Sequence, residues 1–224
     1  MALLINTKDF LYTEVVFEAR YSSQLMILER TPANKLSKKI KNTWQVRQYA
    51  ESEINYLNNN ITANVFLDKI GMSMIDNINL DIFITHVKSF APQVMSFFDI
   101  GNLHRLGFRV KCIAEKQTLE EAVNNCMSLT TAKEKHSLGE IIGCGVRFTV
   151  KSGTLLSNIV INPVQNQQIV VEPNSTTSQT RYGIMVDIDI FSEGNFSRTH
   201  IESFTSNALS YLRNNIFPFL NNMG

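Results

Sequence analysis

Apolar and polar residues alternate along residues 12 to 21 of the chain. Val15 and Phe17 fall on one side of an extended backbone, and Glu14 and Glu18 fall on the other. Because successive side chains of a strand point to opposite faces, this period of two is typical of a half-buried strand. The pattern predicts a strand with one apolar and one charged face.

Related patterns predict the remaining elements. Apolar runs rich in extended-chain formers indicate strands, and apolar residues that recur every three or four positions indicate helices. Asn79 or Asp81 can cap the middle helix, which Pro92 should kink or split. Thr118 and Glu121 form a capping box for the next helix. The expected strands are 12–21, 24–29, 62–75, 104–115, 141–150, 156–162, 167–171 and 182–191, and the expected helices are 34–57, 79–98, 120–129 and 197–217.

The order of these elements predicts the fold class. Strands come in consecutive runs with short links, which favours antiparallel pairing, and helices interrupt them without strict alternation. We therefore expect an α+β protein with a mainly antiparallel sheet and amphipathic helices packed on one face. Residues 1–224 would form a single domain. A long apolar strand followed by a long helix ends each half, about 1–100 and 101–224, which is the pattern of a weak internal duplication.

Composition narrows the function classes. Lys and Arg number 21 against 20 Asp and Glu, so the chain lacks the basic surplus of most nucleic-acid or anionic-membrane binders. Three cysteines without CxxC spacing indicate neither a disulfide framework nor a zinc site. With no membrane-length apolar run and no cationic leader pattern, we expect a cytoplasmic protein without a cofactor.

Three cations share one face of the strand expected at 104–115. Arg105, Arg109 and Lys111 alternate with apolar residues, and Gly107 on the same face would let a ligand approach the backbone. One interpretation is an anion-binding stripe for phosphate or a nucleic-acid backbone. The alternative, which the frequency of cross-strand ion pairs favours, is that acids on neighbouring strands neutralise these cations.

A source of such acids is the strand expected at 182–191. Asp187 and Asp189 fall on one face there, opposite an apolar face. Two carboxylates two residues apart could hold a divalent metal ion, but no third ligand is identifiable from spacing. Neutralisation of the cations of the 104–115 strand is the simpler interpretation.

A resemblance rests on two segments of the sequence. Residues 105–109, Arg-Leu-Gly-Phe-Arg, resemble the Arg-x-Gly-Leu-Arg-Tyr-Ile-Asn strand that marks a widespread family of uncharacterised bacterial proteins of about this length. Residues 12–20 are similar to the first strand of that family. Val110, Lys111 and Cys112 replace the Tyr-Ile-Asn portion. The resemblance implies a bacterial protein and supplies no activity and no catalytic residue.

A second basic cluster lies at the start of the helix expected at 34–57. Lys35, Lys38 and Lys39 precede Trp44, and cations beside an aromatic ring are what a single-stranded nucleic-acid surface uses. A solvated lysine face of a helix explains the same residues with fewer assumptions, because the net charge of the chain is so small.

Searches for catalytic patterns find little. The chain has no Gly-x-Ser-x-Gly elbow and no phosphate-binding glycine loop, and its four histidines lack metal-ligand spacing. His136 and Cys144 are reactive types close in sequence, but Cys144 fits better as a small apolar core residue. An enzyme is therefore the least favoured class.

The last helix is unusually apolar toward its end. Apolar residues on more than one side of this helix predict a second contact surface besides the core, in a homo-oligomer or with another protein. We therefore expect a non-catalytic binding or assembly module, itself oligomeric or part of a bacterial complex. The alternatives are a nucleic-acid or phosphate-ligand binder and a chaperone-like binder of extended polypeptide. The candidate interface residues are Phe204, Leu212, Phe217 and Phe219.

Overall fold

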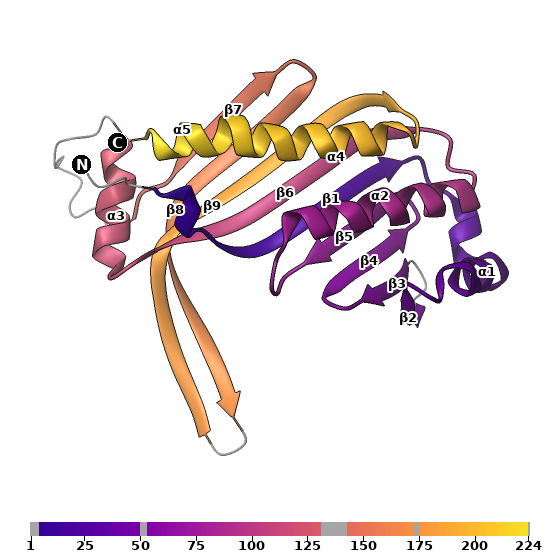
Figure 1. The fold of residues 1–224 in the computed structure, drawn as a ribbon, viewed down its shortest axis with the longest axis horizontal. Coiled ribbons are helices and arrows are strands. Elements are labelled where there is room, and N and C mark those ends of the chain that lie inside the picture. Colours follow the sequence, from indigo (N-terminus) through magenta and orange to yellow (C-terminus); the bar gives the residue numbers. More distant parts are fainter. Residues whose placement is uncertain (1–4, 50–52, 131–142, 173–174, 224) are drawn as a thin grey trace.

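The protein is built around one large antiparallel sheet with helices packed against it (Figure 1). The computed structural model describes residues 5–49, 53–130, 143–172 and 175–223. The α+β class and the antiparallel sheet are confirmed. The strands are β1 (Leu11–Tyr21), β2 (Gln45–Tyr49), β3 (Glu53–Asn58), β4 (Ile61–Phe66), β5 (Lys69–Met74), β6 (Leu103–Lys116), β7 (Val146–Ser152), β8 (Leu155–Glu172) and β9 (Ser175–Phe196). The helices are α1 (Arg30–Ile40), α2 (Leu80–Phe97), α3 (Leu119–Ser128), α4 (His200–Tyr211) and α5 (Phe217–Asn221), with a π-helical turn (Leu212–Ile216) between the last two and short 3-10 helices at Thr7–Asp9 and Leu25–Leu28.

The sheet has the order β2-β3-β4-β5-β1-β6-β9-β8-β7. β1 and β6 pair antiparallel at its middle, with Phe17 opposite Phe108. On either side of this central pair the strands follow in matching sequence, and each half runs strand, helix, strands, helix. The arrangement of elements is thus the one that two similar halves would produce, although an internal duplication at the level of residues stays a prediction.

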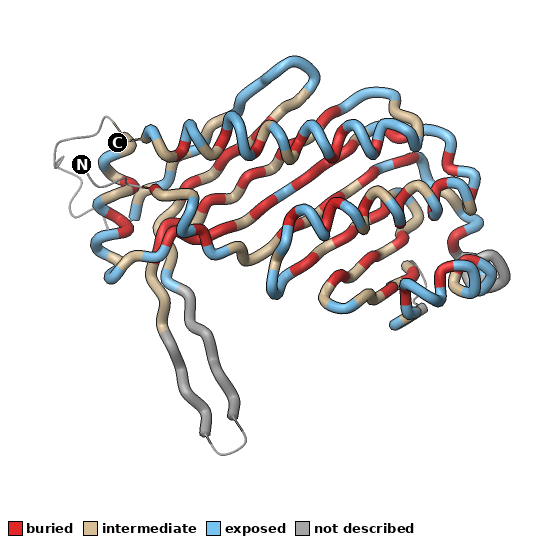
Figure 2. Tube along the Cα trace, in the orientation of Figure 1, coloured by how far each residue is buried: buried red, intermediate tan, exposed pale blue. Residues whose placement is uncertain are grey.

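Alternate residues of the central strands form the core. On β6, Leu106, Phe108 and Val110 are fully buried, as the period of two requires. α2 packs on β1 and β5, α4 packs on β6 and β9, and the two helices contact each other. Figure 2 shows the buried stripes running along the strands behind these helices.

Two segments near residue 40 differ from the prediction. Residues 24–29 form a 3-10 turn and not a strand, because the amide of Gln24 donates to the carbonyl of Leu67 and the amide of Glu29 donates to that of Met26. The helix expected at 34–57 ends at Ile40 and is followed by the β2–β3 hairpin. In β3, Ile54 and Tyr56 are buried and Asn55 between them is not, which is the period of two of a strand.

Three other boundaries of strands and helices also differ from the prediction. The strand expected at 62–75 is the β4–β5 hairpin, whose turn at residues 67–68 contains neither Gly nor Pro. α2 begins at the Asn79 cap as expected but is not split by Pro92. The break expected at Pro163 is absent, because β7 pairs with β8 only as far as Ile161 and a strand tolerates Pro where it has become an edge.

None of the helices in the described ranges has the length and apolar character needed to cross a bilayer.

Candidate binding surface

The cations of β6 lie in a network of ion pairs on the sheet face opposite the buried β6 residues. The side-chain nitrogens of Arg105 lie 3.2 Å from an oxygen of Glu18 on β1 and 3.2 Å from an oxygen of Asp189 on β9. Its guanidinium group also stacks 4.7 Å from the ring centre of Phe191. The guanidinium carbon of Arg105 also lies over Gly107, at an ordinary contact distance of 4.0 Å from where a Cβ atom would stand.

The other two cations of the stripe also have acidic partners. Arg109 donates to both carboxylate oxygens of Asp187, with Nε 2.7 Å from Oδ1. Lys111 lies 2.5 Å from a carboxylate oxygen of Glu14. The neutralisation interpretation is therefore the arrangement seen in the structure, and it weakens the case for an anion-binding stripe.

Glu18 is the most connected acid of this network. Besides Arg105, it accepts a hydrogen bond of 2.6 Å from Arg20 and lies 3.5 Å from Lys69. Burial alone would raise the pKa of the Glu18 carboxyl, but the hydrogen bond from Arg20 and the nearby charges outweigh burial, so its pKa lies below the ordinary value.

The pKa of Asp189 is shifted in the opposite direction. Burial raises the pKa of its carboxyl, and the charges of Arg105 and Arg109 offset only part of that effect. As a metal ligand, Asp189 would need Asp187 and further donors, but each of the two aspartates is held by an arginine. Within the described ranges, three or more His, Cys, Asp or Glu side chains nowhere gather as metal ligands would.

The second basic cluster divides into two environments. Lys35, Lys38 and Lys39 are exposed on α1, whereas Trp44 is only 3% exposed. The indole packs 4.6 Å from the ring of Phe90 and edge-on to His86 on α2. Trp44 therefore leaves little of its ring exposed for stacking on a base, because the indole packs against the aromatic rings of α2. That it contributes to a ligand site stays a prediction.

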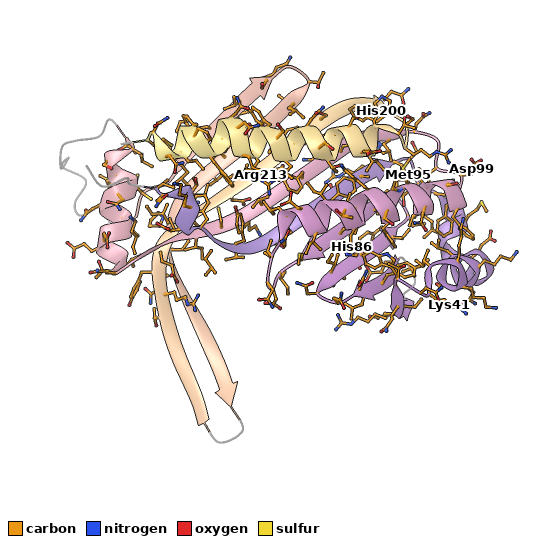
Figure 3. All side chains as sticks on the ribbon, viewed as in Figure 1. Lys41, His86, Met95, Asp99, His200 and Arg213 are labelled. Carbon is orange, nitrogen blue, oxygen red and sulfur yellow. The ribbon has the colours of Figure 1, made fainter. Side chains whose placement is uncertain are left out.

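Trp44 nevertheless forms part of a shallow hollow between α1 and β2. The hollow has a volume of about 390 Å³, and Lys38 and Lys41 lie along it, whereas Lys35 and Lys39 do not. Figure 3 shows Lys41 beside α1 at one end of the molecule. The structure thus brings together part of the basic cluster.

The four candidate interface residues lie mostly in the core. Leu212 is fully buried and Phe204 is 6% exposed, and Phe217 packs edge-on to Phe10 at 5.8 Å. Of the four, Phe219 is the exposed one, and its ring meets Phe148 on β7 at 5.4 Å. The π-helical turn shifts the apolar stripe around the helix axis, so residues that a straight helix would place on two sides face one core.

The sheet has a two-stranded extension that was not expected from the sequence. β9 pairs with β6 only from Tyr182 onward, and β8 pairs with β7 only up to Ile161. Residues 163–172 of β8 and 175–181 of β9, here called the arm, pair with each other out to Glu172 and Ser175. In Figure 1 the arm projects from the body of the sheet as a two-stranded ribbon. Its length is about 20 Å at ~3.3 Å per residue.

A hollow of about 380 Å³ lies at the base of the arm. Val164 and Arg181 belong to the arm side of it, and Leu11, Ile75 and Ile113 supply apolar surface from the sheet. Leu11 and Ile75 are 39% and 61% exposed. The arm is therefore rooted beside exposed apolar surface.

The chain matches no protein-family model, and a search of curated proteins finds no match. The resemblance to the uncharacterised bacterial family stays a prediction.

Proposed function

We propose that this protein is a non-catalytic assembly module that forms a homo-oligomer by pairing its arm with the arm of a second copy. The observation that carries the proposal is that both outer edges of the arm are free of any other described strand. An isolated two-stranded hairpin is at best marginally stable in water. Pairing with a further strand would satisfy its backbone groups and stabilise it.

The sequence of the arm supports strand pairing. From residue 163 to residue 181 the charged residues are Glu172 and Arg181 alone. Natural edge strands carry charges, lysine above all, that block pairing with other chains. The arm lacks this protection over most of its length, and its Ile, Val and Thr content favours extended structure.

A second copy is the partner that this chemistry favours. Two identical arms that each carry one acid, Glu172, and one base, Arg181, have no net charge to repel each other, and antiparallel pairing about a two-fold axis gives each the same contacts. Such pairing would also bring a second molecule toward the apolar surface of Leu11 and Ile75 at the base of the arm.

The remainder of the molecule fits a scaffold role. We infer that the helices form one layer on the sheet, since the buried residues of α1, α2, α3 and α4 pack with the buried face of the strands. The opposite sheet face would then be held by its ion pairs and would present a rigid base for the arm.

The test is the oligomeric state of the full chain. Sedimentation equilibrium between about 1 and 100 μM, the range of many reversible homodimers, should give a concentration-dependent dimer. A variant in which residues 167–180 are replaced by an Asn-Gly turn should be a monomer that still unfolds in one cooperative transition.

Charge insertion provides the matched control. Thr177→Lys in the arm should weaken the dimer, whereas Thr149→Lys on the exposed edge strand β7 should not. A wild-type monomer at every concentration overturns the proposal. Loss of the dimer with Thr149→Lys alone would also overturn it and would assign assembly to the β7 edge.

One observation favours a second function, binding of a phosphate-bearing ligand such as single-stranded nucleic acid. Lys38 and Lys41 share a hollow with Trp44, which is the single tryptophan of the chain. Trp44 fluorescence therefore reports on this hollow without a label. Titration with a thymidine oligonucleotide should change the emission with an affinity that falls steeply as salt rises.

Two double variants distinguish the basic surfaces. Lys38→Ala with Lys41→Ala should abolish the response, and Arg105→Ala with Arg109→Ala should leave it unchanged, because these arginines are already paired with acids. No change in emission at low salt would exclude this function. Loss of binding only in the arginine variant would restore the β6 stripe as the ligand site.

A further inference from the structure

Two of the three cysteines meet where α3 lies against the sheet. Cys126 is buried in the last turn of α3, and Cys144 is half-buried just before β7. The sulfur of Cys144 lies 3.9 Å from the carbonyl oxygen of Cys126, although the residues are 18 positions apart in the sequence. The fold therefore places the free Cys144 thiol against the backbone of Cys126, and the two thiols are close enough to influence each other electrostatically.

We propose that Cys126 and Cys144 are a site of reversible disulfide formation that ties α3 to the start of β7. The proposal rests on their contact and on their placement on neighbouring elements. Neither residue belongs to a group of metal-ligand side chains within the described residues, so coordination does not account for the pair.

Formation of the disulfide needs an oxidant, and a small-molecule disulfide such as oxidised glutathione supplies it. The thiolate of Cys144, which is the more accessible residue, attacks the glutathione disulfide and releases one glutathione thiolate. Cys126 then gives its proton to water and attacks the sulfur of Cys144, which releases the second glutathione thiolate. Two protein thiols are oxidised, and one small disulfide is reduced to two thiols.

The environment of each sulfur fixes the order of these steps. Burial and the neighbouring Cys144 raise the pKa of the Cys126 thiol to about 11, so Cys126 is a poor first nucleophile. Once Cys144 carries glutathione, however, the attack by Cys126 is intramolecular and needs only a small fraction of thiolate. We therefore expect slow oxidation that proceeds through a mixed disulfide on Cys144.

The third cysteine is an internal control. Cys112 is fully buried on β6, its sulfur lies 3.6 Å from the carbonyl oxygen of Val186, and burial strongly raises its pKa. It should stay reduced under conditions that oxidise the other two.

The cross-link would act at the root of the arm. α3 packs against β6, β8 and β9, and the last two strands continue into the arm. A disulfide to the start of β7 would close a loop of the chain and restrict separation of α3 from these strands. The proposal does not depend on self-association, because both sulfurs belong to one molecule.

The test uses the full chain incubated with oxidised glutathione. Intact-mass measurement should show the loss of two hydrogens, peptide mapping should place the disulfide between Cys126 and Cys144, and dithiothreitol should reverse it. Cys112→Ser should behave like the wild type. Cys126→Ser should stop at a glutathione adduct on Cys144, and Cys144→Ser should leave Cys126 largely unmodified.

Thermal unfolding gives an independent readout. The oxidised protein should unfold at a higher temperature than the reduced protein, and the Cys144→Ser variant, which removes only a half-buried thiol, should show no such shift. Glutathione adducts on the wild type without loss of two hydrogens would overturn the proposal. A disulfide between two chains, or one that includes Cys112, would overturn it equally.

Discussion

At the scale of single residues, Glu18 is the hub of the charged sheet face. Arg20, Lys69 and Arg105 converge on one carboxylate, which is 21% exposed. Isolated surface ion pairs contribute little, but an acid shared by three cations in a half-buried setting contributes more because its loss leaves several charges unbalanced.

We therefore expect Glu18→Gln to destabilise the protein by about 1–2 kcal/mol at pH 7. The pKa of Glu18 in the folded protein lies below its ordinary value, so the stabilising effect is present at neutral pH and is lost as pH falls through the folded pKa. Urea unfolding of the wild type and the variant should show a difference in free energy that shrinks in acid.

Glu202→Gln, at an exposed position on α4, is the control and should change stability by less than ~0.5 kcal/mol. An equal effect of the two substitutions, or a Glu18 effect that persists unchanged below the folded pKa, would show that the network contributes no electrostatic stability.

At the scale of elements, the C-terminal helical segment contains both fully buried and exposed apolar side chains. α4, the π-helical turn and α5 follow each other without a break from His200 to Asn221, and Pro218 lies in the first turn of α5, where its missing amide is tolerated. Arg213 in the turn donates hydrogen bonds to Asp81 at the start of α2 through both of its terminal nitrogens, at 3.0 and 2.7 Å.

This geometry predicts unequal effects of truncating two apolar residues of that segment. Leu212→Ala should cost about 2–4 kcal/mol, because it opens a cavity in a fully buried site. Phe219→Ala should cost less than ~1.5 kcal/mol, since its ring is 42% exposed and retains one edge contact with Phe148. Chemical denaturation of both variants measures the difference. A larger cost for Phe219 would mean that this ring is covered in solution, as in an interface.

Hairpin turns account for most of the differences between the predicted and the observed strands and helices. The turn at residues 67–68 and the change from helix to strand after Ile40 carry no glycine or proline signal. The local sequence identifies the apolar run at residues 62–75 but does not show where one strand ends and the next begins. That boundary is set by the pairing of β5 with β1 and of β4 with β3. β1 is distant in sequence, and β3 is itself ambiguous in the sequence. By contrast, the caps at Asn79 and Thr118 were predictable because each acts within three residues.

At the scale of the whole molecule, the two basic surfaces have different surroundings. The β6 cations face acids on β1 and β9, so they hold strands together, whereas Lys38 and Lys41 line a hollow. Near-neutral charge therefore reflects cancellation across neighbouring strands and not an absence of charged surface. The arm carries only Glu172 and Arg181 as charged residues, and for this reason we base the functional proposal on it.

The sequence by itself determined the α+β class, the two faces of β1, β6 and β9 and the helix caps, because these depend on periodicity and on contacts within a few residues. It left open whether Asp187 and Asp189 meet a metal ion or the arginines of β6. Only the tertiary structure shows the arginines beside these acids, because the register of β6 against β9 pairs Arg109 with Asp189 and Lys111 with Asp187. The tertiary structure also decided where the sheet ends and the arm begins, because β8 and β9 extend beyond the residues that β7 and β6 pair with.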